Sequence, residues 1–150
     1  MAISRARYHK RKQRYQKKSG SRRYEQGFYR PINEEKYRQP HDKYMNKGIY
    51  PEYRSSWEKK FMKYCDTNPE IEYWTCEPLA INYVSPKDGR IHRYYPDFLI
   101  KKNNIQYLIE IKPYSQTSDP LNIAKWDSAK KFCEKYHMEF LVLTEKELGV

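Results

Sequence analysis

The pattern of hydrophobic and polar positions changes near residue 55 and divides the chain into two parts. After that point apolar residues recur at helical or strand spacing. Residues 1–54 show no sustained period, apart from a short helix predicted around residues 4–17, and glycine and proline interrupt them repeatedly. The sequence therefore predicts a poorly structured N-terminal arm over residues 1–54 and a folded domain over residues 55–150.

The second part is predicted to contain a helix, three strands, a second helix and a last strand. Trp57, Phe61 and Cys65 recur every four residues, which places them on one face of a helix that ends before Asn68. The predicted strands are 79–84, 92–100, 105–112 and 139–144, with tight turns at 85–89 and 102–104, and the second helix is 120–136. Hairpin strands followed by a helical crossover predict an α/β (α+β) fold, a mixed β-sheet flanked by helices.

Charge separates the same two parts. The net charge is +11, and residues 1–30 hold eleven Lys and Arg against one acid, Glu25. Residues 55–150 hold fourteen basic and fourteen acidic residues, so the predicted domain is neutral. Eight tyrosines accompany the charge within residues 1–54. Tyrosine and arginine can stack on bases and neutralise phosphates, but they also suit a protein interface, and a solvated basic tail is the third interpretation.

The candidate DNA-contacting residues are the basic side chains of the arm and two lysines of the second predicted helix. On that helix, lysines more often form a solvated face, and this alternative stays open. The candidates are Arg5, Arg7, Lys10, Arg11, Lys12, Arg14, Lys17, Lys18, Arg22, Arg23, Lys125 and Lys130.

Composition excludes several classes of protein. No apolar run is long enough to predict a membrane span, and no apolar stretch follows the basic N-terminus as in a signal peptide. The three cysteines, Cys65, Cys76 and Cys133, are odd in number and far apart, so we expect reduced thiols rather than a zinc site or a disulfide framework. The four histidines are equally scattered.

Candidate chemistry lies in the two strands that flank the turn at 102–104. Glu110 and Lys112 are two apart, so their side chains share one face of a strand. In a hairpin, Asp97 becomes a cross-strand neighbour of residues near 108–110, which allows Asp97 and Glu110 to converge. Two adjacent carboxylates repel each other, and Mg²⁺ would relieve that repulsion. Lys112 could then orient a water molecule, although an ordinary solvated Glu–Lys pair is the alternative.

Glu58 is a third candidate acid, with a competing local role. Ser55 and Glu58 have the spacing of a capping box, in which the Glu58 carboxylate would bind the Ser55 amide at the helix start. The tryptophans Trp57, Trp74 and Trp126 are predicted to be core residues rather than base-stacking groups.

These residues together carry a resemblance to a known family. Pro96-Asp97 followed by Glu110-Ile111-Lys112 resembles the PD-(D/E)xK nuclease superfamily, and the helical Glu58 is similar to the extra acid of its transposon-endonuclease-like branch. A wider string resembles the head-completion nucleases of tailed phages with contractile tails. That string comprises 54–58, 68–71, Trp74, Glu77, 94–97, 110–113 and 144–145.

The resemblance implies a restriction-endonuclease-like core with metal ligands at Asp97, Glu110 and the Ile111 carbonyl. Lys112 would be the catalytic lysine, and Glu58 would be an accessory catalytic acid and an additional candidate ligand. It implies Mg²⁺, replaceable by Mn²⁺, and endo- and exonuclease activity on double-stranded DNA. The expected place of action is the head–neck region of the virion and the host cytoplasm, during head completion and before head–tail joining.

Residues 1–53 are longer and more basic than that family leads us to expect, so their role is not carried over. Binding of the arm to portal or neck proteins would fit incorporation into the virion. Two alternatives remain: a structural neck or head-closure protein with a residual nuclease site, and a non-enzymatic nucleic-acid-binding module. The combination of Asp97, Glu110 and Lys112 argues against the second.

Overall fold

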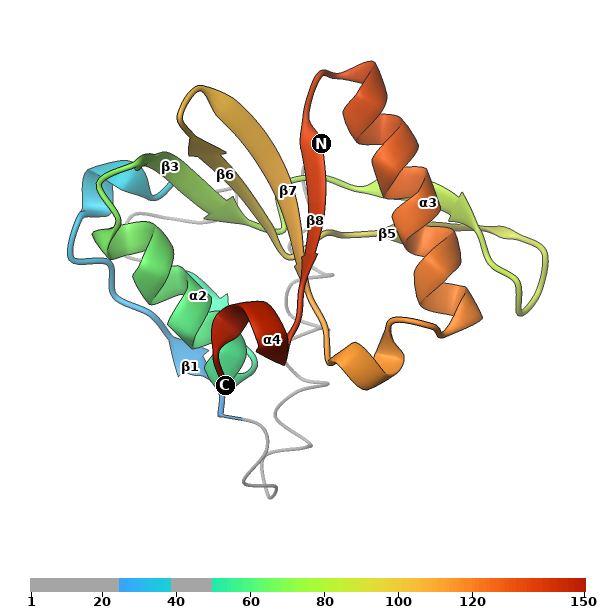
Figure 1. Cartoon of the computed structure of the whole chain (residues 1–150), viewed down its shortest axis with the longest axis horizontal. Coiled ribbons are helices and arrows are strands. Elements are labelled where there is room, and N and C mark those ends of the chain that lie inside the picture. Colours follow the sequence, from blue (N-terminus) through green and yellow to red (C-terminus); the bar gives the residue numbers. More distant parts are fainter. Residues whose placement is uncertain (1–24, 39–49) are drawn as a thin grey trace.

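The computed structural model describes residues 25–38 and 50–150 of the chain. A four-stranded sheet lies between two helices, and a separate two-stranded hairpin extends past one of them (Figure 1). The sheet is mixed: β3–β6 and β6–β7 are antiparallel, whereas β7–β8 is parallel. In the order β3-β6-β7-β8 these strands are Ile71–Cys76, Phe98–Lys102, Ile105–Ile111 and Glu139–Leu143. The predicted mixed sheet flanked by helices is confirmed.

Each face of the sheet packs against one long helix. Helix α2, Ser56–Thr67, contributes Phe61, Met62 and Cys65 to a core beneath one face. Helix α3, Pro120–Lys135, contributes Trp126, Ala129 and Cys133 to the core on the other face. Both helices match their predicted positions. The sheet is therefore covered on both sides, and β7 is buried from Leu108 to Ile111.

Strand β3 is absent from the sequence prediction, although it forms one edge of the main sheet. Its residues are buried at Ile71 and again from Tyr73 to Thr75, so the clean alternation of a half-exposed strand is missing. The short helix α4, Glu145–Leu148, was also not predicted. It begins with a capping box in which Thr144 and Glu147 bond each other's backbone amides.

The predicted strand 92–100 is wrong as a single element. It consists of β5, Ile91–Tyr94, and β6, with a break at Pro96, whose ring nitrogen cannot donate to a ladder. Strand β4, Ile81–Val84, pairs only with β5, and the two form a sheet of their own. This β4–β5 hairpin packs its buried side chains against α3.

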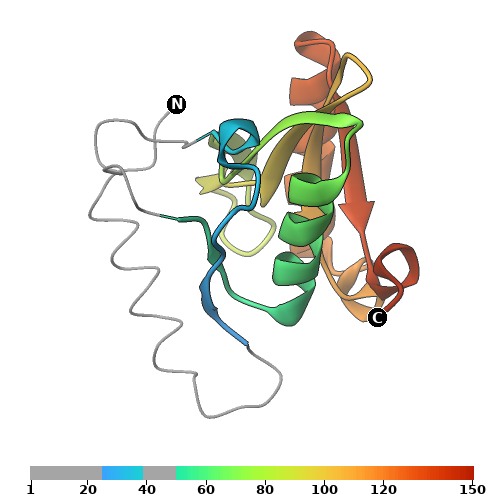
Figure 2. The same cartoon turned by 90° about the vertical axis from the view of Figure 1, so that its left-hand side faces the viewer.

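Part of the predicted arm is ordered and packs beside α2 (Figure 2). It forms two short strands that pair with each other, β1 at Gly27–Phe28 and β2 at Glu52–Tyr53, and the 3-10 helix η1 at Glu34–Lys36. The helix predicted around residues 4–17 lies outside the described residues, and the boundary at residue 54 stays a prediction.

One buried carboxylate joins this segment to α2. Asp66 accepts hydrogen bonds from the Tyr29 hydroxyl at 2.6 Å and from the amides of Ile32 and Asn33 at 2.8 Å each. Lys36 donates to the carbonyls of Asp66 and Asn68 at the end of the same helix. These bonds satisfy polar groups that the helix terminus would otherwise leave unpaired.

Other composition-based predictions have clear outcomes. Trp74 and Trp126 are buried, and Trp57 packs at the edge of the α2 core, so the tryptophans are core residues as predicted. The three cysteines are free thiols in the structure. Within the part of the chain that the structure describes, no helix combines the length and the apolar character that spanning a bilayer demands.

Candidate active site

The β6–β7 hairpin brings Asp97 and Glu110 together. Its register pairs Phe98 with Ile109, so continuing the register by one residue places Asp97 opposite Glu110. The turn is made by Asn103 and Asn104, whose φ angles of 50° and 66° suit a tight two-residue hairpin loop. The Ile111 amide donates to Asp97 Oδ2 at 2.8 Å and fixes that carboxylate against β7. The predicted convergence of the two acids is present in the structure.

Both carboxylates are buried, with 8% of Asp97 and 6% of Glu110 exposed. Burial raises the pKa of Asp97 to about 6, and the negative charge of Glu58 adds to this, against the lowering effect of Arg54. Burial and the charge of Asp97 raise the pKa of Glu110 well above its usual value. Ionisation of the two acids therefore costs free energy in this buried site, and a bound cation would offset that cost.

Lys112 and Tyr94 flank Glu110 on opposite sides. The Lys112 ammonium lies 3.9 Å from Glu110 Oε1, and its side chain is 27% exposed, so it borders both the acid and solvent. The Tyr94 hydroxyl, at the end of β5, donates a hydrogen bond to Glu110 Oε2. Burial raises the pKa of Tyr94, so the phenol stays protonated and remains a donor. No sequence pattern indicated this second partner, because β5 was not separated from β6.

Glu58 takes part in the cap of α2 and also faces the acids. Its amide donates to Ser55 Oγ at 3.1 Å, as the capping box predicts. Its carboxylate, however, accepts from the Arg54 amide at 2.5 Å. The predicted bond from the Ser55 amide is therefore wrong, because the donor is the residue before Ser55. Glu58 Oε1 lies 3.5 Å from the Arg54 guanidinium. The carboxylate is thus engaged locally, at a position close enough to influence the pKa of Asp97.

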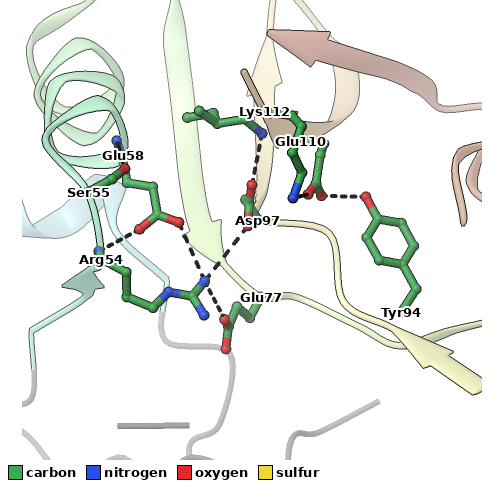
Figure 3. Close-up of polar contacts among 9 residues, drawn as sticks. Arg54, Ser55, Glu58, Glu77, Tyr94, Asp97, Glu110 and Lys112 are labelled. Carbon is green, nitrogen blue, oxygen red and sulfur yellow. Dashed lines mark hydrogen bonds and ion pairs between the residues drawn. The ribbon is translucent and has the colours of Figure 1, made fainter. Parts of the chain in front are cut away.

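Arg54 is a site residue to which no sequence pattern assigned a role. Its Nη2 atom lies 2.8 Å from Glu77, 3.5 Å from Glu58 and 3.7 Å from Asp97 (Figure 3). Glu77 follows β3 with a φ of 48°, which is uncommon for a residue with a side chain, and its amide donates to the Asp97 carbonyl at 2.8 Å. The strand end and the guanidinium together fix where Asp97 lies.

The side chains at this site suit a hard divalent cation. Asp97 and Glu110 present carboxylate oxygens on neighbouring strands, and Mg²⁺ binds through one or two carboxylates while keeping water and phosphate oxygens as its other ligands. No cluster of three or more His, Cys, Asp or Glu residues with metal-ligand geometry occurs within residues 25–38 and 50–150. A two-carboxylate Mg²⁺ site is consistent with both observations, and the Ile111 carbonyl as a ligand stays a prediction.

The predicted DNA-contacting residues have different placements. Lys125 lies 5.8 Å from the Tyr83 ring centroid and 5.9 Å from that of Tyr94, and burial followed by the nearby charge of Lys112 lowers its pKa. Lys130 is exposed on α3. All the candidates in the arm, from Arg5 to Arg23, fall outside the described residues.

Two comparisons with known proteins identify related sequences. Residues 68–145 match the family of the TnsA-like endonuclease N-terminal domain. The chain is also 34% identical over 119 residues to the head completion nuclease of Enterobacteria phage T4, an alignment that covers 64% of this chain and 79% of that protein. The matched region contains Asp97, Glu110 and Lys112, together with the sheet that positions them. The chain therefore belongs to the TnsA-like endonuclease N-terminal family.

Proposed function

We propose that this chain is a Mg²⁺-dependent deoxyribonuclease that acts in phage head completion, before heads and tails join. The observation that carries the proposal is the buried pair of Asp97 and Glu110 with Lys112 beside it. Family membership and the likeness to a head completion nuclease support the reaction class and the biological step. The substrate would be double-stranded DNA, and the place of action would be the head–neck region of the particle and the host cytoplasm.

Each residue has a separate role in the proposed reaction. A bound Mg²⁺ would polarise the scissile phosphate and make a bound water molecule easier to deprotonate for attack. Asp97 and Glu110 hold their oxygens in fixed positions because the Ile111 amide and the Tyr94 hydroxyl bind one oxygen of each. Lys112 can orient the attacking water or stabilise the charge that develops on the phosphate. Arg54 balances the acids on the side toward Glu58.

The decisive experiment replaces Asp97 and measures plasmid nicking in Mg²⁺ and in Mn²⁺. Asp97→Ala should abolish cleavage, whereas Asp127→Asn, which changes an exposed acid on α3, should cleave like the wild type. Calorimetric titration with Mg²⁺ should give binding to the wild type and none to Asp97→Ala. Undiminished nicking by Asp97→Ala would rule out this site as the nuclease centre.

Particle assembly separates the enzyme from the structural alternative. We expect phage carrying Asp97→Ala to accumulate heads that fail to join tails. Normal joining by these particles would instead favour a neck or head-closure protein in which the nuclease site is residual.

A further inference from the structure

The β4–β5 hairpin has one face packed in the core and one face open to solvent. Ile81, Tyr83 and Tyr94 are buried with Trp126 of α3. The antiparallel register places the pairs Asn82–Arg93 and Val84–Ile91 on the opposite face, because alternate residues of a strand point to opposite sides. We call these four residues the outer face of the hairpin, and all four are exposed.

The outer face carries an apolar pair that no described part of the chain covers. Val84 is 58% exposed and Ile91 is 72% exposed, and they lie directly opposite each other across the two strands. Such a pair stabilises a hairpin by cross-strand contact. That contact leaves most of both side chains in water, however, so the pair is also available to a partner.

Three basic residues lie on the same hairpin as this apolar pair. Lys87 and Arg90 lie in or beside the turn, and Arg93 stands on the outer face itself. The one acid of the hairpin, Asp88, is already engaged, because it contacts His92 at 2.7 Å and accepts from the Arg90 amide at 2.9 Å. The turn projects past α3, at the right of Figure 1, where a long partner could reach it. This charge favours a polyanion over an apolar or basic protein surface.

The base of the hairpin leads directly to the candidate active site. Tyr94 ends β5 and donates its hydroxyl hydrogen bond to Glu110. Lys125 lies over the rings of Tyr83 and Tyr94, close enough to Lys112 on one side and to Lys87 on the other for both charges to act on it. On the side of the hairpin that faces α3, basic side chains thus connect the turn with the carboxylates, so a DNA molecule that contacts the turn could also reach the acids.

We propose that the β4–β5 hairpin binds double-stranded DNA with its turn and its outer face, and that the bound DNA continues past the turn to the side of the hairpin on which the acids lie. Lys87, Arg90 and Arg93 contact phosphates, and the Val84–Ile91 pair lies against base or sugar edges in the minor groove. Proteins that bind this groove often combine basic contacts with inserted apolar side chains. The proposal rests on DNA being the substrate of the proposed nuclease.

The first test measures binding without catalysis. The full-length chain in EDTA is titrated into a short fluorescein-labelled DNA duplex, and anisotropy is recorded over a range of salt concentrations. Lys87→Gln with Arg90→Gln should reduce the slope of log K against log salt by about 0.9 for each phosphate that is no longer neutralised. The matched double variant Lys63→Gln with Lys135→Gln removes two exposed lysines elsewhere and should keep the wild-type slope.

The second test separates the apolar pair from the charges. Val84→Thr with Ile91→Thr keeps β-branched side chains, and it should weaken binding about tenfold at fixed salt without changing the slope. Circular dichroism checks the fold, and Val84→Thr alone is measured if the double variant is unfolded. The proposal is overturned if the charge variant and the apolar variant both bind DNA with the affinity and the salt slope of the wild type. Sedimentation velocity without DNA tests the other occupant: a wild-type dimer that the apolar variant no longer forms, with unchanged DNA binding, would overturn the proposal and assign the face to a second copy of the chain.

These outcomes are independent of the nuclease test. If the hairpin variants bind normally while Asp97→Ala abolishes cleavage, the hairpin proposal fails and the proposed function stands. If the wild type does not cleave DNA but the hairpin variants lose affinity, the surface is correct and the proposed function fails.

Discussion

The Arg54 guanidinium contacts three carboxylates that belong to different parts of the chain. Glu58 comes from α2, Glu77 follows β3, and Asp97 precedes β6. Removing one partner of a buried ion pair leaves the other charges in a poorly solvated place, which costs more than the pair itself contributes. Arg54 is therefore a residue whose loss should affect the fold as well as the site.

We expect Arg54→Met to lower the free energy of unfolding by about 3 kcal/mol at neutral pH, because three acids lose their shared cation. Urea denaturation followed by tryptophan fluorescence would measure the change. Arg93→Met removes an exposed arginine and should alter stability by less than about 0.5 kcal/mol. Equal midpoints for the two variants would show that the buried ion pairs have little net effect.

The hydrogen bond from Tyr94 to Glu110 should strengthen metal binding. Tyr94→Phe removes the hydroxyl that holds Glu110, while the ring stays in the core. Partners that orient metal ligands typically contribute about 10–100-fold to metal affinity, so we expect about a tenfold loss of calorimetric Mg²⁺ affinity. Tyr83→Phe is the matched control, since Tyr83 also packs under Lys125 but forms no hydrogen bond with Glu110 in the structure.

Among the elements, residues 25–38 dock on α2 through Asp66. Burial by itself raises the pKa of this carboxyl, but hydrogen bonds from the Tyr29 hydroxyl and the Ile32 and Asn33 amides outweigh that effect and lower it from 3.8. A carboxylate whose pKa falls on folding stabilises the native state above its unfolded pKa. That contribution is lost as the pH falls through the lower, folded value.

Titration of Asp66 should make the free energy of unfolding fall in acid. Between about pH 5 and pH 2 the wild type should lose more unfolding free energy than Asp66→Asn, which cannot titrate. Asp66→Asn should also be less stable than the wild type at pH 7, since an amide cannot accept all the bonds that the carboxylate accepts. Chemical denaturation at each pH measures both effects. Parallel pH profiles for Asp66→Asn and the wild type would exclude Asp66 as the source.

The elements differ in how visible they are in the sequence. The β6–β7 hairpin was predictable because Asn103 and Asn104 form an obvious turn and the acids follow the strand period. Strand β3 was not, since burial on both faces removes the alternation. The partners of Asp66 could not be predicted because they lie 30 or more residues away in the sequence. The partners of Arg54 could not be predicted because its three carboxylates belong to three different parts of the fold. Local patterns therefore identified the acids, whereas the groups that hold them depend on tertiary packing.

At the scale of the whole molecule, the charge of the chain is divided between a basic N-terminus and a neutral domain. Residues 1–24 hold ten Lys and Arg and no acid. Residues 25–38 pack beside α2, and Tyr29 binds Asp66. A truncation that tests the basic residues should therefore stop before Tyr29, so that docking of the segment on α2 is preserved.

We expect deletion of residues 1–24 to reduce the salt dependence of DNA binding by several units of slope, because many cations that neutralise phosphates are removed together. Thermal stability should stay close to that of the full chain. A larger deletion, of residues 1–30, should also lower the melting temperature because it removes Tyr29. An unchanged salt slope after the first deletion would show that the basic residues serve a partner other than DNA.

The turn at Asn103–Asn104 has a consequence for how the protein folds. The segment from Asp97 to Glu110 closes on itself as a hairpin, and hairpins form in about 1–10 μs. Strand β8 reaches β7 only after the chain has crossed over through α3, which makes that parallel pairing a late, non-local step. We expect higher φ-values for substitutions in the hairpin than in β8. The two carboxylates would then become neighbours while water still surrounds them, and their mutual repulsion would grow only as α3 closes over the sheet.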